Sequence, residues 1–384
     1  MLYQLEFRTY QRKFKRPLQT SHGVWDVREG IILRLIDENG KIGWGEIAPL
    51  SWFGSETFEQ ALDFCSQLSA IISEETIFAI SAELPACQFG FESALSNSRS
   101  PLTEGGHAPS TAPTNEATRN ILKVPLLKGD LGGSSLSLKP TFIVASVLSC
   151  HKLPQPRNED KIYNQYSGLL PAGEAALSAI KMLWQQGFRT FKWKIGVATI
   201  EEELQVFQLL VKALHDFADR KKALLRLDAN GGLNYSQAET WLQTCDNVSE
   251  IPDFSVKIEF LEQPLSVPQF ESMLALSALY KTAIALDESV ANLDRIQECY
   301  NQGWRGIFVI KPAICGSPSQ LRKFCQTHNI DAVFSSVFET QIGRQAALNL
   351  ATEISLNSRA LGFGTDDWFD DNQDTWLKHL WQQM

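Results

Sequence analysis

The 384-residue sequence has no CxxC motif, and its seven cysteines are scattered and odd in number. Such a chain does not build a disulfide framework, so we expect buried, reduced thiols in a reducing compartment. No apolar run approaches the about 18 residues of a membrane-spanning helix, and we expect no membrane span. The first residues, MLYQLEFRTY, show neither the basic segment nor the apolar core of a signal peptide. We therefore expect a cytoplasmic protein.

The chain also lacks an excess of positive charge, since its net charge is -9 and no basic stripe occurs. Nucleic acid is therefore not an expected partner. The six histidines form neither HxH nor HExxH, which argues against a zinc site built on histidine. No GxGxxG follows the first strand of the repeating part of the chain, which disfavours a dinucleotide-binding Rossmann sheet.

Residues 1–130 contain the patterns of an α+β domain. The alternating stretch LEFRTYQRKFKRPL predicts a strand, and GIILRLIDENGKIGWGEIAPL predicts two strands joined by an Asn-Gly turn. SETFEQALDFCSQLSAII and ACQFGFESALS predict helices, the first with Ser55 as its N-cap. The segment 96–120 is rich in Ser, Thr, Pro, Gly and Ala, which predicts a flexible surface insertion.

Residues 140–345 repeat a strand–helix pattern. The helical stretch AGEAALSAIKMLWQQG ends at Gly187, a predicted C-cap, and the strand FRTFKWKIG follows. Five more short apolar runs are separated by helical sequence: ALLRLD, VKIEFLE, TAIALD, GIFVIK and DAVFSS. This alternation predicts parallel βαβ units, and their number favours an α/β barrel. We expect residues 346–384 to supply the last barrel strand and a C-terminal segment that packs on the N-terminal domain.

Two lysines stand two residues apart in the stretch TFKWKIG. Because side chains alternate along a strand, Lys192 and Lys194 share one face, and Phe191, Trp193 and Ile195 share the other. In a barrel strand the apolar face packs on helices. The lysines should therefore point inward near the carboxyl end of the strand, where barrel enzymes carry out their chemistry.

The same placement recurs at four later strand ends, which carry Asp228, Glu262, Asp287 and Lys311. A single carboxylate after a strand is usually a helix cap or a turn former. Repetition in consecutive units favours a shared site instead. Three carboxylates from adjacent strands supply hard oxygen ligands, which suit Mg²⁺, with Mn²⁺ as an alternative, better than Zn²⁺.

The lysines flank these carboxylates in the chain order. A second cation disfavours the charged form of a lysine, so Lys192 and a divalent metal would suit Lys194 to act as a base. The metal would stabilise a developing enolate oxyanion. The pattern thus predicts removal of a proton next to the carboxylate of a small-molecule substrate. The alternative interpretation is a pair of lysines with buried stems whose charged ends reach solvent at the rim.

Five motifs, KWK, LDANGG, FLEQPL, ALDES and VIKPA, resemble in this order the barrel motifs of the enolase superfamily, in particular its muconate-lactonizing-type branch. The stretch GWGEIAPLSWFGSETFEQA is similar to that family's capping domain, whose loops close over the substrate. The resemblance covers nearly the whole chain. It implies a modified (β/α)7β TIM-type barrel with an α+β capping domain, whose mobile loop would be TSHGVW at 20–25.

The resemblance also implies roles for the strand-end residues. The metal ligands would be Asp228, Glu262 and Asp287. Lys194 would remove the proton α to the carboxylate and then protonate the leaving hydroxyl, and Lys192 would support it electrostatically. Lys311 would lie across the substrate and stabilise the enediolate.

Further positions match residues that surround the site in this family. Asn230 and Glu288 would lie behind the metal ligands. Ser335 and Ser336 would lie near the substrate, and Gly364 would belong to the loop after the eighth strand.

Two stretches, GEIAPL…FGSETFEQA and FSSVFETQIG, are most similar to superfamily members that dehydrate 2-succinyl-6-hydroxy-2,4-cyclohexadiene-1-carboxylate to 2-succinylbenzoate in menaquinone and phylloquinone biosynthesis. The resemblance thus implies a Mg²⁺-dependent carbon–oxygen lyase. An N-acylamino acid racemase, a dipeptide epimerase or a muconate-type cycloisomerase would share the metal and the lysines and stays an alternative. The adjacent Asp366 and Asp367 do not match the Asp-x-Asp of the epimerases. A non-catalytic carboxylate-binding protein is a remoter alternative, because the lysines and all three ligands are present.

Overall fold

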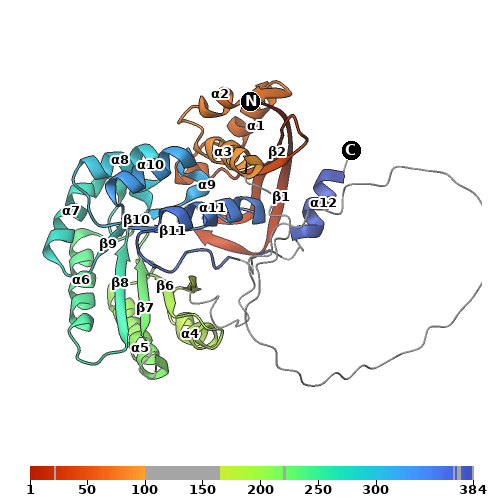
Figure 1. The fold of residues 1–384 in the computed structure, drawn as a ribbon. Coiled ribbons are helices and arrows are strands. Elements are labelled where there is room, and N and C mark those ends of the chain that lie inside the picture. The colour runs from red at the N-terminus through yellow and green to blue at the C-terminus, as the bar shows by residue number, and fades with distance from the viewer. Residues whose placement is uncertain (21–22, 100–164, 219–221, 366–367, 370–372, 383–384) are drawn as a thin grey trace, which may run out of the picture. The chain divides into compact units, whose positions relative to one another are not determined.

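The N-terminal part of the chain forms an antiparallel sheet of four strands in the order β3-β2-β1-β4. A computed structural model of the chain describes residues 1–20, 23–99, 165–218, 222–365, 368–369 and 373–382 (Figure 1). These strands are β1 (Leu2–Thr20), β2 (Gly23–Ile36), β3 (Ile42–Ile47) and β4 (Ile71–Ser73). The predicted strands and the Asn-Gly turn are confirmed. Asp37 Oδ1 accepts from the backbone N–H groups of Asn39 and Lys41, and Gly40 has φ +78°.

The predicted capping loop, residues 20–25, belongs to the hairpin between β1 and β2. Thr20 pairs with Gly23, and residues 21–22 lie outside the described residues.

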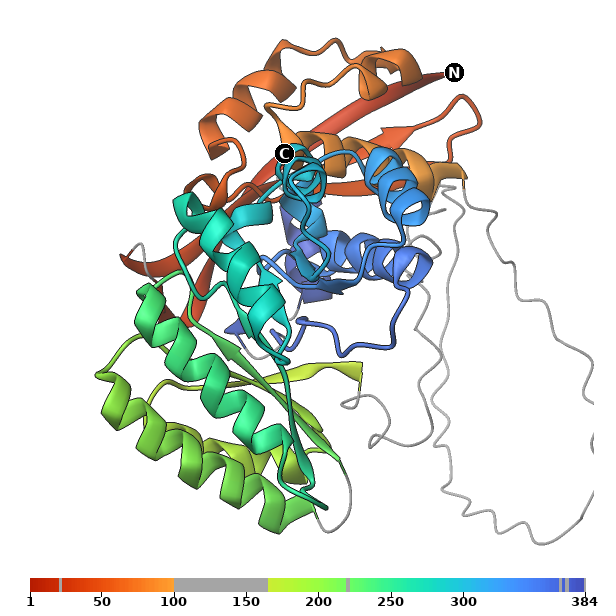
Figure 2. The same ribbon diagram turned by 90° about the vertical axis from the view of Figure 1, so that its left-hand side faces the viewer.

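Three helices and a 3-10 turn complete this part: η1 (Ser51–Phe53), α1 (Phe58–Gln67), α2 (Glu74–Phe78) and α3 (Pro85–Arg99). Figures 1 and 2 show α3 lying along β2 and β3. The predicted cap of α1 is wrong by two residues. Thr57, not Ser55, caps the helix in a reciprocal pair with Gln60, whereas the Ser55 hydroxyl accepts from the Leu50 N–H. Helix α3 includes residues 96–99 of the predicted insertion, and the rest of that insertion lies outside the described residues.

The second sheet is parallel and has seven strands in the order β11-β10-β9-β8-β7-β6-β5. The strands are β5 (Ser167–Leu170), β6 (Thr190–Lys194), β7 (Ala223–Asp228), β8 (Val256–Glu262), β9 (Ile284–Leu286), β10 (Ile307–Ile310) and β11 (Ala332–Phe334). The helices and short turns between and after them are α4 (Ala175–Gln185), α5 (Ile200–Ala218), α6 (Tyr235–Ser249), η4 (Val267–Gln269), α7 (Phe270–Leu279), η5 (Glu288–Val290), α8 (Leu293–Asn301), α9 (Pro312–Cys315), α10 (Pro318–His328), α11 (Gln341–Ile354) and α12 (Gln373–Gln382). Figure 1 shows α5 and α6 along the outside of β7 and β8.

The barrel closes without a regular eighth strand in the described part of the chain. Instead, residues 361–362 make one parallel bridge on each side, Tyr166 with Leu361 and Ser335 with Gly362. These bridges connect the end of β11 to the start of β5. The predicted (β/α)7β barrel with an α+β capping domain is confirmed. At its last position the barrel closes through these two bridges and not through a full strand.

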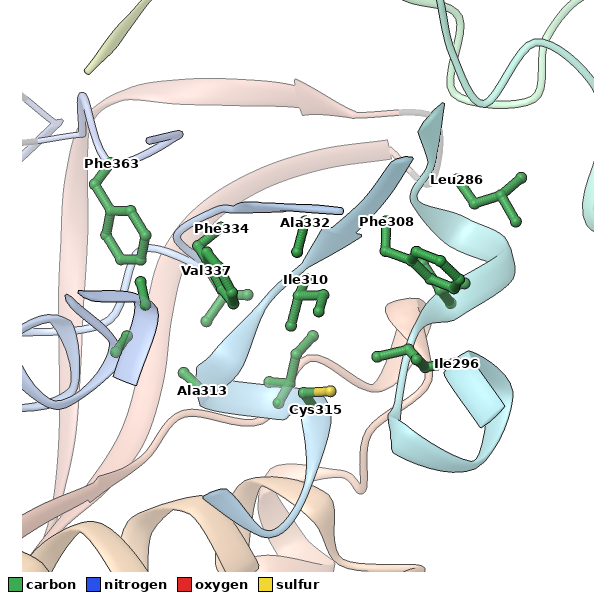
Figure 3. Close-up of a cluster of buried hydrophobic side chains, with 14 of the residues drawn as sticks. Leu286, Ile296, Phe308, Ile310, Ala313, Cys315, Ala332, Phe334, Val337 and Phe363 are labelled. Carbon is green, nitrogen blue, oxygen red and sulfur yellow. The ribbon is translucent and has the colours of Figure 1, made fainter. Parts of the chain in front are cut away.

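The alternation of side chains along the strands separates two cores. Phe260, Ala285, Ile307, Val309 and Val333 form a small cluster of their own inside the barrel. Their strand neighbours belong to the larger core between the sheet and the helices. Figure 3 shows part of that core, with Phe308, Ile310 and Phe334 among the labelled side chains. The inward face of each strand therefore leads, at its carboxyl end, to the ionisable residues predicted from the sequence.

The C-terminal helix α12 packs on β1 of the first sheet. The Trp376 ring meets Tyr10 edge-on with 5.4 Å between ring centroids, and Trp381 meets Trp44 at 4.9 Å. None of the described helices is long and apolar enough to span a membrane. All six cysteines in the described residues are buried free thiols.

Candidate active site

The carboxyl ends of neighbouring strands lie side by side, so they gather the predicted residues at one edge of the barrel. Lys194 on β6 pairs in register with Asp228 on β7, and Asp228 pairs with Glu262 on β8. Glu262 pairs with Ala285, two residues before Asp287. All three carboxylate side chains are buried. Asp228 and Glu262 end β7 and β8, Asp287 directly follows β9, and all three lie at the same end of the barrel.

Lys192 lies between two of these carboxylates. Its Nζ is 2.7 Å from Asp228 Oδ2 and 2.7 Å from Glu262 Oε1. Burial alone would lower the pKa of Lys192, but Asp228, Glu262 and Asp287 together raise that pKa above its ordinary value. Lys192 is therefore held in its charged form and balances the carboxylates.

Lys311 lies at the other side of the carboxylates. It follows β10, and its Nζ donates to Asp287 Oδ1. The same ammonium lies 3.9 Å from the centre of the Phe53 ring, which belongs to η1 of the first domain. This cation–π contact brings a capping-domain residue directly against the barrel site.

Lys194 has a neutral partner. Its Nζ donates to Asn230 Oδ1 at 2.7 Å, and the Asn230 amide donates in turn to Glu288 Oε1 at 3.0 Å. Asn230 adopts the left-handed backbone conformation, with φ +44°, in the turn that follows β7. Asparagine tolerates this conformation better than most residues do, which helps to explain its place here. The turn directs its side chain to both Lys194 and Glu288.

The buried carboxylates strongly influence one another. Burial and the adjacent Asp228 raise the pKa of Glu262 to about 8, against the opposing effect of Lys192. Burial and Asp287 raise the pKa of Glu288 to about 7. The second oxygen of Glu288 is buried and has no hydrogen-bond partner among the described residues. Such a cluster is stabilised by additional positive charge.

The residues fit a hard divalent cation such as Mg²⁺. Asp228, Glu262 and Asp287 supply only oxygen atoms, from three neighbouring strands. As placed, no three His, Cys, Asp or Glu side chains of the described residues surround a common metal position. The ammonium groups of Lys192 and Lys311 instead contact oxygens of Asp228, Glu262 and Asp287.

Two further residues of this site were not predicted from the sequence. Gln263 is fully buried with φ +37°, and its side-chain oxygen accepts from the backbone N–H groups of Asp287 and Ser289. It thereby orients the backbone that carries Asp287. The sequence feature that could have identified Gln263 is its position directly after Glu262. Phe53 had no such signal, because it lies in another domain.

The predicted substrate-side residues lie just after β11 and just after the closing bridges. The Ser335 N–H donates to the carbonyl of Ile310 at 2.9 Å, which places Ser335 beside the residue that precedes Lys311. The Ser336 hydroxyl is buried and donates to Glu339. Gly364 is exposed, and a Cβ added there would lie 3.0 Å from the Ser167 carbonyl oxygen. Asp366 and Asp367 lie outside the described residues.

Two protein families match the chain. The family described as "Enolase C-terminal domain-like" matches residues 174–379, and the family described as "MenC, N-terminal domain" matches residues 9–98. The first match covers the barrel with its strand-end lysines and carboxylates. The chain therefore belongs to the enolase superfamily.

Similarity to individual proteins identifies the family within this superfamily. An o-succinylbenzoate synthase of Thermosynechococcus vestitus is 34% identical over 386 residues, which cover 99% of this chain and 98% of the relative. The o-succinylbenzoate synthase of Photorhabdus laumondii is 28% identical over 82% of this chain and 76% of its own. Within the superfamily, the chain belongs to the o-succinylbenzoate synthase family.

Solved structures agree with this fold. The o-succinylbenzoate synthase from Thermosynechococcus elongatus BP-1, a crystal structure with Mg in the active site, superposes with a TM-score of 0.73 at 32% identity, over 99% of this chain and 100% of that one. A dipeptide epimerase from Methylococcus capsulatus superposes with a TM-score of 0.65 at 16% identity, over 97% and 93% of the two chains. The second likeness shows the fold alone.

Proposed function

We propose that this protein catalyses the dehydration of 2-succinyl-6-hydroxy-2,4-cyclohexadiene-1-carboxylate to 2-succinylbenzoate, a step of menaquinone and phylloquinone biosynthesis. The observation that carries the proposal is the arrangement of lysines at one end of the barrel. Lys194 ends β6 and Lys311 follows β10, on opposite sides of three buried carboxylates. The family membership supports the same reaction.

Lys194 is the proposed acid and base of the reaction. It removes the proton from the carbon next to the substrate carboxylate and then delivers that proton to the leaving hydroxyl, which departs as water. The ring becomes aromatic, and the protons and electrons balance without any other reactant. The hydrogen bond from Lys194 to neutral Asn230 supports this role, because it orients an amine that makes no ion pair with the part of the chain that the structure describes.

Lys311 is proposed to stabilise the charge that develops on the substrate carboxylate as an enediolate forms. Its position against Phe53 supports this role, because the ring keeps water from that side of the ammonium. Lys192 is proposed to balance the charge of Asp228 and Glu262, which it already contacts.

Asp228, Glu262 and Asp287 are the residues that would hold Mg²⁺. When bound there, the cation supplies positive charge beside the substrate carboxylate and so makes the neighbouring proton easier to remove. Asn230, Glu288 and Gln263 are proposed to hold these ligands and Lys194 in place. Ser335, Ser336 and Gly364 are proposed to face the substrate. The buried free thiols support a reducing, cytoplasmic setting.

The test is a spectrophotometric assay of the purified protein with the cyclohexadiene substrate and Mg²⁺. Loss of the diene absorbance that EDTA suppresses and excess Mg²⁺ restores is the expected result. A protein that is folded and binds Mg²⁺ but leaves the absorbance unchanged would overturn the proposed reaction. The same preparation would then be assayed for proton exchange on N-acylamino acids and dipeptides in deuterated water.

A further inference from the structure

Glu46 is a buried carboxylate outside the strand-end cluster. It lies on β3 of the capping domain, and its side chain is fully shielded from solvent. Its two oxygens accept from the backbone N–H of Thr340, each at 2.9 Å, and one of them also accepts from the Gly343 N–H at 2.9 Å. The Thr340 and Tyr10 hydroxyls donate to the same carboxylate. Glu46 therefore joins the capping domain to the start of helix α11.

The first turn of α11 is shaped to receive this carboxylate. The first N–H groups of a helix have no partner within the helix, and they favour negative charge. A Cβ added at Gly343 would lie 2.7 Å from Glu46 Oε2, so any side chain there would displace the carboxylate. Tyr10, which also contacts Glu46, pairs with Gly30 in the sheet. A Cβ added at Gly30 would lie 2.5 Å from the Tyr10 hydroxyl oxygen. Glycine at both positions leaves room for the contact.

The residues just before α11 are those that follow β11. Phe338 adopts a left-handed conformation with φ +62°, which is costly for an aromatic residue and is retained only where neighbours hold it. Its N–H donates to the Ser336 hydroxyl, and its ring meets Phe14 and Trp25 of the capping domain edge-on. Glu339 accepts from Ser336 and from the Val337 N–H. The segment 335–339 is thus held at one end by Ser335 beside β10 and at the other by Glu46.

We propose that Glu46 is a positioning residue for the reaction. It holds the N-terminus of α11, and with it the segment 335–339, in a fixed position relative to the strand ends that carry Lys194 and Lys311. The inference rests on the proposed function for its effect on the substrate, since Ser335 and Ser336 are the residues taken to face it. The structural effect on segment 335–343 does not depend on that function.

The chain provides a matched control in Glu92 of helix α3. This buried carboxylate also reaches from the capping domain to the start of a barrel helix, where it accepts from the Ser317 hydroxyl and from the Ser319 N–H at 3.0 Å. That helix, α10 (Pro318–His328), is a different helix from α11, into which segment 335–339 leads. A merely structural contact between the two domains would be weakened equally by Glu46→Gln and by Glu92→Gln.

The experiment compares the full-length wild type, Glu46→Gln and Glu92→Gln by steady-state kinetics and by hydrogen exchange of peptides that cover residues 335–343. For Glu46→Gln we expect a kcat/KM about 10- to 100-fold lower, carried mainly by KM, because the two lysines are untouched. We also expect faster exchange in 335–343. Glu92→Gln should leave both readouts at wild-type values.

Equal kinetics for the two variants, or unchanged exchange of 335–343 in Glu46→Gln, would overturn the proposal. If Glu46→Gln does not fold, Tyr10→Phe removes a single hydrogen bond to the same carboxylate and should raise KM in the same direction by a smaller factor. An unchanged KM in Tyr10→Phe would then overturn it. If the wild type itself shows no turnover, the proposed function fails, and the exchange comparison alone decides the role of Glu46.

Discussion

Lys192 and Lys194 share a strand face but have different surroundings. Lys192 contacts two carboxylates and remains charged because they raise its pKa against the effect of burial. Lys194 contacts a neutral amide, and it makes no ion pair with the described residues. A base must lose its proton readily, and an ammonium ion held by carboxylates does not. This difference supports Lys194 as the residue that exchanges protons and Lys192 as the residue that balances charge.

Lys194→Ala tests this division at the level of a single residue. We expect turnover to fall by about 10²- to 10⁴-fold, the usual contribution of a general base, while Mg²⁺ affinity stays the same. Kinetic assays and calorimetric Mg²⁺ titration measure the two effects. Lys257→Ala, which removes an exposed lysine from β8, is the control and should be fully active. Turnover within tenfold of the wild type would show that the base is misassigned.

Glu262→Gln tests the proposed metal site. The substitution keeps the shape of the side chain but removes its charge, so we expect Mg²⁺ affinity to fall by about tenfold or more. Activity measured against Mg²⁺ concentration reports the change. Glu271→Gln, at an exposed position on α7, should not alter the Mg²⁺ requirement. An unaltered requirement in Glu262→Gln as well would remove this residue from the ligand set.

At the scale of elements, an ionic network supports the barrel where residues 361–362 replace a full eighth strand. Strand β8 has a register shift against β7, and Glu259 is the extra residue. Glu259 contacts Arg226 at 2.7 Å and Arg359 at 2.8 Å, and Arg359 also contacts Asp331 at 2.7 Å. The network therefore connects β7 and β8 to the segments that precede β11 and the closing bridges.

Arg359→Met tests this closure through pH dependence. Burial alone would raise the pKa of Asp331, but hydrogen bonds from Arg359 and Asn357 lower that pKa below its ordinary value. A carboxyl with a lowered native pKa contributes stability above its unfolded pKa of about 3.9 and loses it as pH falls through the native value. We expect Arg359→Met to lower the free energy of unfolding by about 1–3 kcal/mol at neutral pH and to flatten its pH dependence below about 4.

Urea unfolding at several pH values measures both effects of Arg359→Met. Arg322→Met, which removes a more exposed ion pair with Glu353, is the control and should change the free energy of unfolding by less than about 1 kcal/mol. Identical pH profiles for the wild type and Arg359→Met would contradict the role of Asp331 in the closure.

At the scale of the whole molecule, the capping domain and the barrel share both the proposed site and the C-terminal helix. Phe53 contacts Lys311, and Glu46 and Glu92 contact the starts of two barrel helices. Helix α12 packs on β1, and Trp381 contacts both the Trp44 ring and the guanidinium of Arg34. The end of the chain thus stabilises the sheet at its beginning.

Trp381→Ala should therefore destabilise the protein without changing its chemistry. The loss of an edge-on aromatic pair and of cation–π contacts with Arg8 and Arg34 should lower the free energy of unfolding by about 1–3 kcal/mol. Denaturant unfolding measures this change, and kcat/KM at 25 °C should stay at the wild-type value. Leu356→Ala, at an exposed apolar position, is the control. Unchanged stability in Trp381→Ala would mean that α12 contributes little to the capping sheet.

The sequence alone was sufficient to predict the barrel and the edge of the barrel at which its ionisable residues meet. Side chains alternate along a strand and parallel strands end at the same edge, so a repeated strand-end position maps to a shared location. Lys194, Asp228, Glu262, Asp287 and Lys311 were found by this rule, which needs no knowledge of distant contacts. Local signals also predicted the Asn-Gly hairpin and the end of α4 to within two residues, because Gln186 caps the helix and Gly187 follows with φ +99°.

Only the tertiary structure decided which residues from distant parts of the chain complete the site. Glu46 and Thr340 are 294 residues apart, and the sequence around neither residue indicates that the two are in contact. Phe53 reaches Lys311 only because the two domains are packed together. The cap of α1 and the narrow closure at 361–362 likewise depended on competing partners and on packing. Periodicity determines which way a side chain points, whereas the partner it meets depends on how the whole chain folds.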